Sequence, residues 1–277
     1  MARVLALSSQ VARGHVGLSA IVPALQRLGH EVWPLPTIIL SNHPGHVHAA
    51  GLRIAPAALE EMIGALERNG WLGEIDAVIT GYLPSAEHVH SAAAVVRRLR
   101  AERSIYYLCD PVLGDEPKGL YVDPGAAGAV KDLLVPSADL ITPNRFELGW
   151  LADSQVEALE DLERAARSLT STAVLVTSAA RREDLLDNLL VQESSVQSCS
   201  VPYRTAVPHG TGDVFAALVL GHVLDGATEA MAMAKAAAGV DQAIVASAGR
   251  DELALVPSQE AWSTAEPLPL SVRKLAS

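Results

Sequence analysis

Short apolar runs alternate along most of the chain with longer segments in which apolar residues recur every three or four positions. The short runs at 4–7, 32–35, 77–80, 105–108, 140–141 and 173–176 predict buried strands. The segments at 21–29, 56–68, 92–101, 127–134, 145–151 and 156–169 predict helices. Such alternation is typical of a doubly wound, mostly parallel sheet with helices on both faces. We therefore predict an α/β fold.

The last third of the chain departs from this alternation. Residues 189–192 and 200–203 predict an antiparallel pair of strands, and two apolar helices follow at 214–224 and 229–247, the second with Thr228 as its N-cap. No linker or internal repeat divides the sequence. We predict one domain over residues 1–277, with the tail from about residue 257 at its periphery.

Composition and charge exclude several classes of partner and fold. Hydrophobic residues make up 49% of the chain and aromatic residues 4%, which suits helices packed on a parallel sheet. The net charge of −11 and the lack of a basic stripe argue against nucleic acid or an anionic membrane as partner. The two cysteines, Cys109 and Cys199, exclude a disulfide scaffold and predict small buried side chains. With no signal peptide or membrane span in the sequence, we expect a cytoplasmic protein.

Small or polar residues follow the predicted strands. In an open α/β sheet, ligands bind beyond the carboxyl ends of the strands. One or two polar strand ends occur by chance, whereas a whole series of them predicts the rim of an active site. The residues concerned are Ser8, Ser9, Gly81, Tyr82, Asp110, Thr142, Asn144 and Thr177.

The segment Gly210-Thr211-Gly212-Asp213 immediately precedes an apolar helix. Glycines let backbone N–H groups converge, and the helix N-terminus adds its positive dipole, so the turn suits a phosphate group. Asp213 beside a phosphate is costly unless it takes a proton from the attacking group. At an ordinary aspartate pKa of about 3.9 it would be ionised and a weak base. The alternative is an ordinary helix start with an aspartate cap.

Several longer motifs together resemble one family. The sequences concerned are Gly14-His15-Val16-Gly17, Val32-Trp33-Pro34-Leu35, Leu40-Ser41-Asn42-His43, Ile79-Thr80-Gly81-Tyr82, Cys109-Asp110-Pro111-Val112-Leu113-Gly114, Thr142-Pro143-Asn144-Arg145-Phe146-Glu147 and the turn before residue 214. This combination resembles the pyridoxal kinases of the ribokinase-like superfamily, from about residue 4 to beyond residue 255. The resemblance implies ATP-dependent phosphorylation of the 5′-hydroxymethyl group of pyridoxal by a homodimer, with Mg²⁺ accompanying ATP and a monovalent cation left open.

The resemblance also implies roles for individual residues. Asp213 would be the general base, and the amides of Gly210, Thr211 and Gly212 would form the anion hole. ATP would be held by Asp110, Thr142, Asn144, Glu147, Thr177 and Val201, with Glu147 and Asp110 also serving the metal. Pyridoxal would contact Ser9, His43, Pro44, Gly45, Tyr82 and Asp213. Residues 115–125 would form a lid over ATP.

Simpler explanations exist for some of these residues. Tyr82 also fits ordinary core packing, Glu147 a solvated carboxylate in a first helical turn, and Asp110 a turn before Pro111. Pro44 stands where relatives commonly have threonine, and it lacks both a hydroxyl group and a backbone N–H. Gln10 and Arg13 also differ from the residues common in relatives, and all three differences lie in segments expected to bind the vitamin. The alternatives are therefore a kinase of the same fold for another alcohol, such as pyridoxine, pyridoxamine, hydroxymethylpyrimidine or a sugar, and a non-catalytic protein that binds pyridoxal phosphate or ATP.

Overall fold

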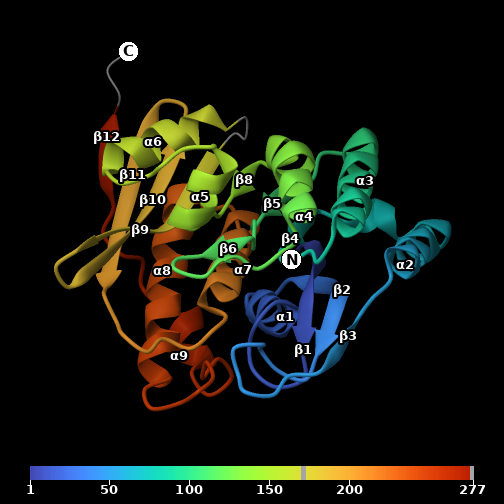
Figure 1. The fold of residues 1–277 in the computed structure, drawn as a ribbon, viewed down its shortest axis with the longest axis horizontal. Coiled ribbons are helices and arrows are strands. Elements are labelled where there is room, and N and C mark those ends of the chain that lie inside the picture. The colour runs from blue at the N-terminus through green and yellow to red at the C-terminus, as the bar shows by residue number, and fades with distance from the viewer. Residues whose placement is uncertain (170–172, 275–277) are drawn as a thin grey trace.

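The computed structural model describes residues 1–169 and 173–274 and is built around one mixed sheet (Figure 1). Its strands lie in the order β12-β11-β10-β9-β8-β5-β4-β1-β2-β3. The six central strands β2, β1, β4, β5, β8 and β9 are parallel to one another. At the two edges, β3 pairs antiparallel with β2, and β10, β11 and β12 continue antiparallel from β9. Their bounds are β1 Arg3–Val11, β2 Glu31–Leu40, β3 Gly51–Arg53, β4 Ala77–Thr80, β5 Tyr106–Cys109, β8 Leu140–Ile141, β9 Ala173–Arg182, β10 Leu185–Gln192, β11 Ser195–Pro202 and β12 Ser271–Lys274.

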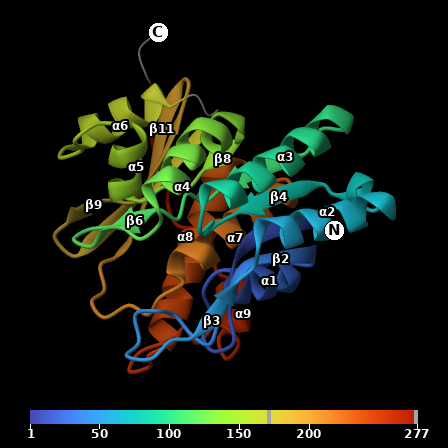
Figure 2. The ribbon, with the colours of Figure 1, turned by 45° about the vertical axis from the view of Figure 1, so that its right-hand side comes forward.

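Helices cover both faces of this sheet, as the alternation predicted (Figures 1 and 2). One face is covered by α1 (Leu18–Arg27), α7 (Thr211–Leu224), α8 (Glu229–Ala246) and α9 (Gln259–Ser263). The other is covered by α2 (Pro56–Arg68), α3 (Ala86–Glu102), α4 (Pro124–Ala129), α5 (Arg145–Leu151) and α6 (Leu159–Ser168). Short helical turns lie at Leu72–Glu74, Val130–Leu134 and Val135–Ser137. The predicted α/β class is confirmed.

Strand β1 explains why the parallel strands read as unbroken apolar runs. Val4 and Ala6 pack into the core beneath α1, α7 and α8, while Leu5 and Leu7 pack into the core on the opposite face. All four side chains are fully buried. A parallel sheet covered on both sides needs apolar residues at every position of its strands, so the alternation of polar and apolar residues disappears.

Two N-terminal strands are longer than predicted. Strand β1 continues through a bulge at Ser8 and Ser9 to Val11, and β2 continues from Leu35 to Leu40. The polar residues after Leu7 indicated a strand end, but β1 continues to pair with β2 through residue 11, and the same part of β2 pairs with the unpredicted β3. Prolines within β2 are tolerated because, before residue 38, it has a strand partner on one side only.

Helix α3 also begins earlier than the predicted 92–101, at Ala86. Its first turns carry polar residues that hid the periodicity, yet His88 and Ser91 are buried. His88 Nδ1 lies 2.8 Å from Ser85 Oγ, and the Ser91 hydroxyl donates to Glu60 Oε1 at 2.9 Å. Hydrogen bonding lets these polar side chains occupy a core position that the sequence pattern assigns to apolar residues.

The expected lid, residues 115–125, contains more regular structure than its glycines and prolines indicated. A short hairpin of β6 (Gly114–Asp115) and β7 (Gly119–Leu120) forms a separate two-stranded sheet. Asp123 then caps α4, its carboxylate accepting from Gly125 N at 2.8 Å. In Figure 2 this hairpin lies beside α5. The first part of the expected lid is therefore an ordered hairpin.

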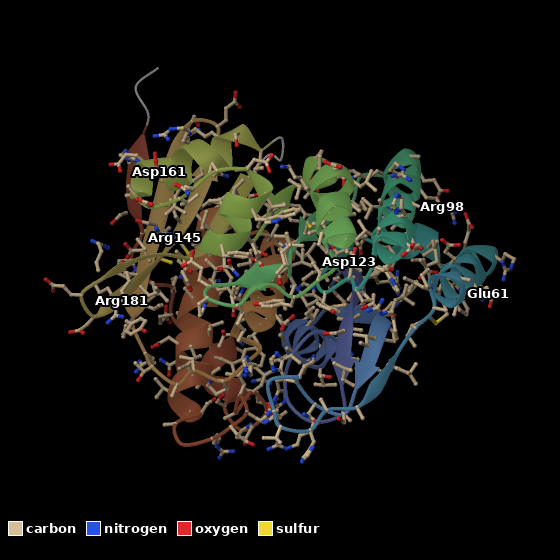
Figure 3. All side chains as sticks on the ribbon, viewed as in Figure 1. Glu61, Arg98, Asp123, Arg145, Asp161 and Arg181 are labelled. Carbon is tan, nitrogen blue, oxygen red and sulfur yellow. The ribbon has the colours of Figure 1, made fainter. Side chains whose placement is uncertain are left out.

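Charged side chains such as Glu61, Arg98 and Arg181 lie on the outside of these layers (Figure 3). Cys109 and Cys199 are buried as predicted, being 1% and 2% exposed. Among the described residues, no helix combines the length and the apolar character needed to span a bilayer.

Candidate active site

The turn before α7 has the geometry of an anion-binding site. Gly210 is the N-cap of the helix in a left-handed conformation, with φ of 96°. A Cβ atom built there would lie 1.8 Å from the carbonyl oxygen of His15, so glycine is required. Thr211, Gly212 and Asp213 form the first turn of α7, where backbone N–H groups have no partner within the helix. These groups and the helix dipole can hold a phosphate.

Asp213 lies within this turn with a perturbed carboxyl group. Burial raises the pKa of Asp213 to about 6, although hydrogen bonds from the backbone N–H groups of Gly17 and of Asp213 itself favour the charged form. The sequence alone led us to expect an ordinary pKa and a weak base. The structure corrects this expectation, because a pKa near neutrality makes a carboxylate a better proton acceptor while leaving most of it ionised at pH 7.

Acidic and hydroxyl side chains from neighbouring strand ends line a cavity of about 510 Å³ that contains Asp213. Asp110 follows β5 and accepts a 2.8 Å hydrogen bond from the Thr142 hydroxyl after β8. Burial, and then the charges of Glu147 and Asp213, hold the pKa of Asp110 well above its usual range. The structure thus brings together seven of the residues predicted from the strand ends and the turn, namely Asp110, Thr142, Asn144, Thr177, Thr211, Gly212 and Asp213.

Glu147 lines the same cavity, but its carboxylate is already engaged. Together with Asn144 it forms a capping box at the start of α5, in which Glu147 Oε2 accepts from Asn144 N at 2.9 Å. Its Oε1 accepts from Leu113 N at 2.9 Å and from Gly114 N at 3.4 Å. The alternative of a solvated carboxylate is wrong, because the residue is 5% exposed and burial raises its pKa to about 7. Glu147 therefore connects the start of α5 to residues 113 and 114, at the beginning of the hairpin.

The Asn144 side chain is similarly occupied. Its Oδ1 accepts from Glu147 N at 2.9 Å, and its amide donates to Gly114 O at 2.8 Å. One amide hydrogen remains for a phosphate oxygen.

The donor set of this cavity is suited to a divalent cation bound together with phosphates. Asp115 lines the cavity with Asp110 and Glu147, and its buried Oδ1 atom has no hydrogen-bond partner among the residues that the structure describes. Within residues 1–169 and 173–274, however, no three His, Cys, Asp or Glu side chains converge closely enough to hold a metal alone. Mg²⁺ fits such a site, because it retains water and binds phosphate oxygens with only one or two carboxylates.

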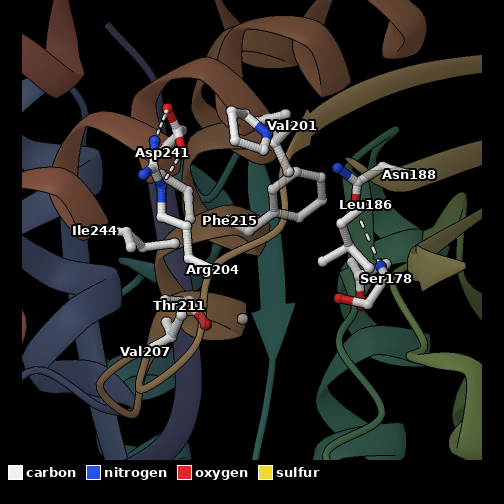
Figure 4. A pocket seen from close by; sticks show the side chains of 15 residues that line it. Ser178, Leu186, Asn188, Val201, Arg204, Val207, Thr211, Phe215, Asp241 and Ile244 are labelled. Atoms are coloured by element: carbon white, nitrogen blue, oxygen red, sulfur yellow. Dashed lines mark hydrogen bonds and ion pairs between the residues drawn. The ribbon is translucent and has the colours of Figure 1, made fainter. Parts of the chain in front are cut away.

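A second cavity, of about 250 Å³, adjoins the first and is shown in Figure 4. Its lining includes Val201 of β11, which the resemblance assigned to ATP, Leu186 and Asn188 of β10, and residues of α8. Arg204 forms a two-point ion pair with Asp241 at its wall, with contacts of 2.8 and 3.2 Å. Thr177, Thr211 and Gly212 line both cavities, so the two are continuous at the N-terminus of α7.

Sequence patterns alone missed the wall made by Arg204, Asp241 and Asn188. Arg204 and Asp241 are 37 positions apart, in a loop and a helix, and no local motif connects them.

The structure also places the end of strand β9 later than predicted, because β9 extends through Thr177 to Arg182. Ser178 has a positive φ of 51° in this strand, which marks the irregular backbone beside Thr177.

On the other side of the turn, the expected vitamin contacts come from three segments. Ser9 packs against Gly17, whose N–H is bonded to Asp213. Tyr82 N donates to Ser8 Oγ at 3.0 Å, and its partly exposed side chain packs against the core. Core packing therefore accounts for part of the Tyr82 ring, as one of the alternatives expected.

His43 brings the loop after β2 close to residues 210–213, the turn before α7, which we call the phosphate turn. Its ring stacks on His209, with centroids 3.7 Å apart, and His209 directly precedes Gly210. Burial, the neighbouring His209 and Lys118 of the lid lower the pKa of His43 to about 4, so the ring is neutral. Pro44 and Gly45 follow on the exposed side of this loop. His209 was not predicted, although its position next to the glycine turn was a signal for it.

Comparison with known proteins places this site in a family. A sequence model described as phosphomethylpyrimidine kinase matches residues 20–254. The chain is 38% identical over 271 residues to pyridoxal kinase PdxY of Leifsonia xyli subsp. xyli, which covers 94% of this chain and 95% of that protein. It is 36% identical over 268 residues to pyridoxal kinase PdxY of Corynebacterium diphtheriae, covering 93% and 94% of the two chains.

Solved structures agree with the sequence relatives. Pyridoxal kinase from Leishmania donovani, in complex with ADP and pyridoxamine, matches with a TM-score of 0.91 and 27% identity over 100% of both chains. The pyridoxal kinase structure from Entamoeba histolytica matches with a TM-score of 0.92 at 23% identity, over 99% of this chain and 100% of that one, and supports the fold alone. The chain belongs to the pyridoxal kinases of the ribokinase-like superfamily.

Proposed function

We propose that this protein transfers the γ-phosphoryl group of ATP to the 5′-hydroxymethyl group of pyridoxal, forming pyridoxal 5′-phosphate and ADP. The observation that carries the proposal is the position of Asp213. Its carboxylate lies in the first turn of α7, at the same point as the N–H groups that suit a phosphate. The substrate relationship comes from the relatives, which are pyridoxal kinases over nearly their whole length.

Asp213 is the proposed general base. It accepts the hydroxyl proton as the oxygen attacks the phosphorus, and its pKa of about 6 keeps it mostly ionised at pH 7. Little covalent chemistry is required of the protein in phosphoryl transfer, so most of the rate comes from alignment and charge stabilisation. The amides of Gly210, Thr211 and Gly212 stabilise the transferring group from the helix N-terminus.

ATP occupies the two continuous cavities in this proposal. Adenine lies beside Val201, and the phosphates extend past Thr177 to Thr142 and the remaining amide hydrogen of Asn144. Asp110 and Glu147 serve Mg²⁺, which offsets phosphate charge when bound. Both Glu147 oxygens already accept backbone hydrogen bonds, and contact to the metal through a water molecule would leave these bonds in place. A monovalent cation remains open.

Pyridoxal lies on the opposite side of the turn, among Ser9, Tyr82 and the loop of His43, Pro44 and Gly45. Stacking of His43 on His209 supports this placement, because it brings the loop next to Gly210. The protein acts as a cytoplasmic homodimer in this proposal, as a single domain with the tail from about residue 257 at its periphery.

The deciding experiment measures Mg²⁺-dependent ATP turnover with pyridoxal, pyridoxine, pyridoxamine and hydroxymethylpyrimidine. Selective turnover of pyridoxal is expected, and size-exclusion chromatography with light scattering tests the dimer in parallel. Preferred turnover of another alcohol would retain the mechanism and change the substrate. Binding of ATP without turnover of any of the four would overturn the proposal in favour of a non-catalytic role.

A further inference from the structure

Glu252 connects two loops that are far apart in sequence. Its Oε1 accepts a hydrogen bond from Arg13 Nη1 at 2.9 Å and lies 3.2 Å from His46 Nε2. Its side chain is only 15% exposed, whereas that of the adjacent Asp251, which pairs with Arg13 alone, is 64% exposed. Glu252 is therefore a largely buried carboxylate with two partners, whereas Asp251 forms an exposed ion pair.

The same carboxylate packs against the backbone of Gly14. Glu252 Oε2 would lie 2.3 Å from a Cβ atom built on Gly14, whose φ is 99°. A side chain at residue 14 would displace Glu252, and the positive φ disfavours any L-residue there. The next residue, His15, is the one whose carbonyl oxygen packs against Gly210. Glu252 thus supports the segment that seats the phosphate turn.

Glu252 reaches the phosphate turn by a second route as well. His46 lies three residues after His43, and His43 stacks on His209 immediately before Gly210. In Figures 1 and 2 the loop after β2 lies beside the connection between α8 and α9, which contains Glu252. One carboxylate therefore holds both segments that flank the turn on the side opposite the adenine cavity.

We propose that Glu252 is a positioning residue for pyridoxal, holding residues 13–17 and 41–50 in place around the attacking hydroxyl group. This inference rests on the proposed function, which assigns these segments to the vitamin. Glu252 lines neither of the two cavities assigned to ATP. Glu252 acts on Gly210 only through intermediate residues, whereas it directly contacts residues of both segments assigned to pyridoxal. Its loss should therefore weaken binding of pyridoxal much more than binding of ATP.

The test compares E252Q and E252A with D251N as the matched control. E252Q and D251N both remove one negative charge, but only E252Q weakens the shared contacts to Arg13 and His46. We expect the KM for pyridoxal to rise about 10-fold in E252Q and further in E252A, since small misplacements of a bound substrate are costly. The KM for ATP should change less than about twofold. D251N should behave as wild type, because exposed ion pairs contribute little.

Thermal unfolding of each variant separates positioning from loss of fold. If E252A does not fold, H46A provides the second variant, because it removes the link to the loop after β2 and should raise the KM for pyridoxal much more than that for ATP. Equal increases in both KM values, or unchanged kinetics in E252Q and H46A, would overturn the inference.

A further variant separates this inference from the proposed function. If P44T changes the KM for pyridoxal but E252Q does not, the loop binds the vitamin and the role of Glu252 is wrong. If neither has an effect, the assignment of residues 41–50 to pyridoxal is also wrong. Absence of turnover in the wild-type protein with any of the four alcohols would refute the proposed function itself.

Discussion

Alanine in place of either glycine of the phosphate turn should have opposite effects on stability and similar effects on activity. Gly210 has a φ of 96°, and its Cβ would lie 1.8 Å from His15 O. Left-handed backbone costs a non-glycine residue about 1–3 kcal/mol, before the clash is relieved. We expect G210A to lose about 2 kcal/mol or more, which corresponds to a Tm at least about 3–4 °C lower for a chain of this size.

Gly212 provides the matched comparison. No atom lies within 4 Å of a Cβ built there, and the residue is in the first turn of α7 without a positive φ. Alanine should therefore leave Tm unchanged or slightly raised, because it lowers the entropy of the unfolded chain. The added methyl group would project beside the N–H groups that receive the phosphoryl group. We expect kcat to fall about 100-fold, comparable with the loss of one donor from an oxyanion hole.

The assay combines thermal unfolding with steady-state kinetics for both variants, with pyridoxal and ATP each varied in turn. G210A should lose stability and activity together, whereas G212A should lose activity alone. Wild-type kcat in a folded G212A protein would refute the reasoning, because it would mean that the phosphoryl group does not approach these amides.

Four other changes test the remaining parts of the site. D213N should lower kcat about 100-fold or more while ATP binding, measured by calorimetry, stays nearly unchanged; in the wild type, kcat/KM should fall tenfold per unit below pH 6, since protonation removes the base. D110N should raise Tm increasingly as the pH rises above about 4, because the pKa of Asp110 is raised on folding and ionisation therefore costs stability in the wild type only; a pH-independent difference in Tm would contradict this. P44T should lower the KM for pyridoxal about 2- to 10-fold by restoring a hydroxyl and an N–H, and an unchanged KM would remove this position from substrate contact. V201F should fill the cavity beside β11 and raise the KM for ATP about 10-fold with no effect on pyridoxal, and equal effects on both substrates would argue against an adenine site there.

Local chemistry explains which predictions from sequence succeeded. Buried parallel strands require continuous apolar runs, so β4 was predicted at its actual bounds of Ala77–Thr80. The helical spacing of apolar residues similarly predicted α2 at its actual bounds of Pro56–Arg68. Where polar residues are buried through hydrogen bonds, the pattern failed, as at His88 in α3 and at Ser8 in β1. The sequence shows that a residue is polar but not whether it will find a partner in the fold.

The α/β class, the polar strand ends and the glycine turn before an apolar helix could be predicted from the sequence, because each depends on residues close together in the chain. The electrostatics of the site and the contacts between its distant segments could not, because they depend on the packed fold. Burial and the neighbouring carboxylates raise the pKa of Asp110. Burial also raises the pKa of Asp213. Folding also brought Arg204 to Asp241 and Glu252 to Arg13 and His46. Desolvation and contacts across tens or hundreds of residues arise only when the chain is packed, and they have no local signature in the sequence.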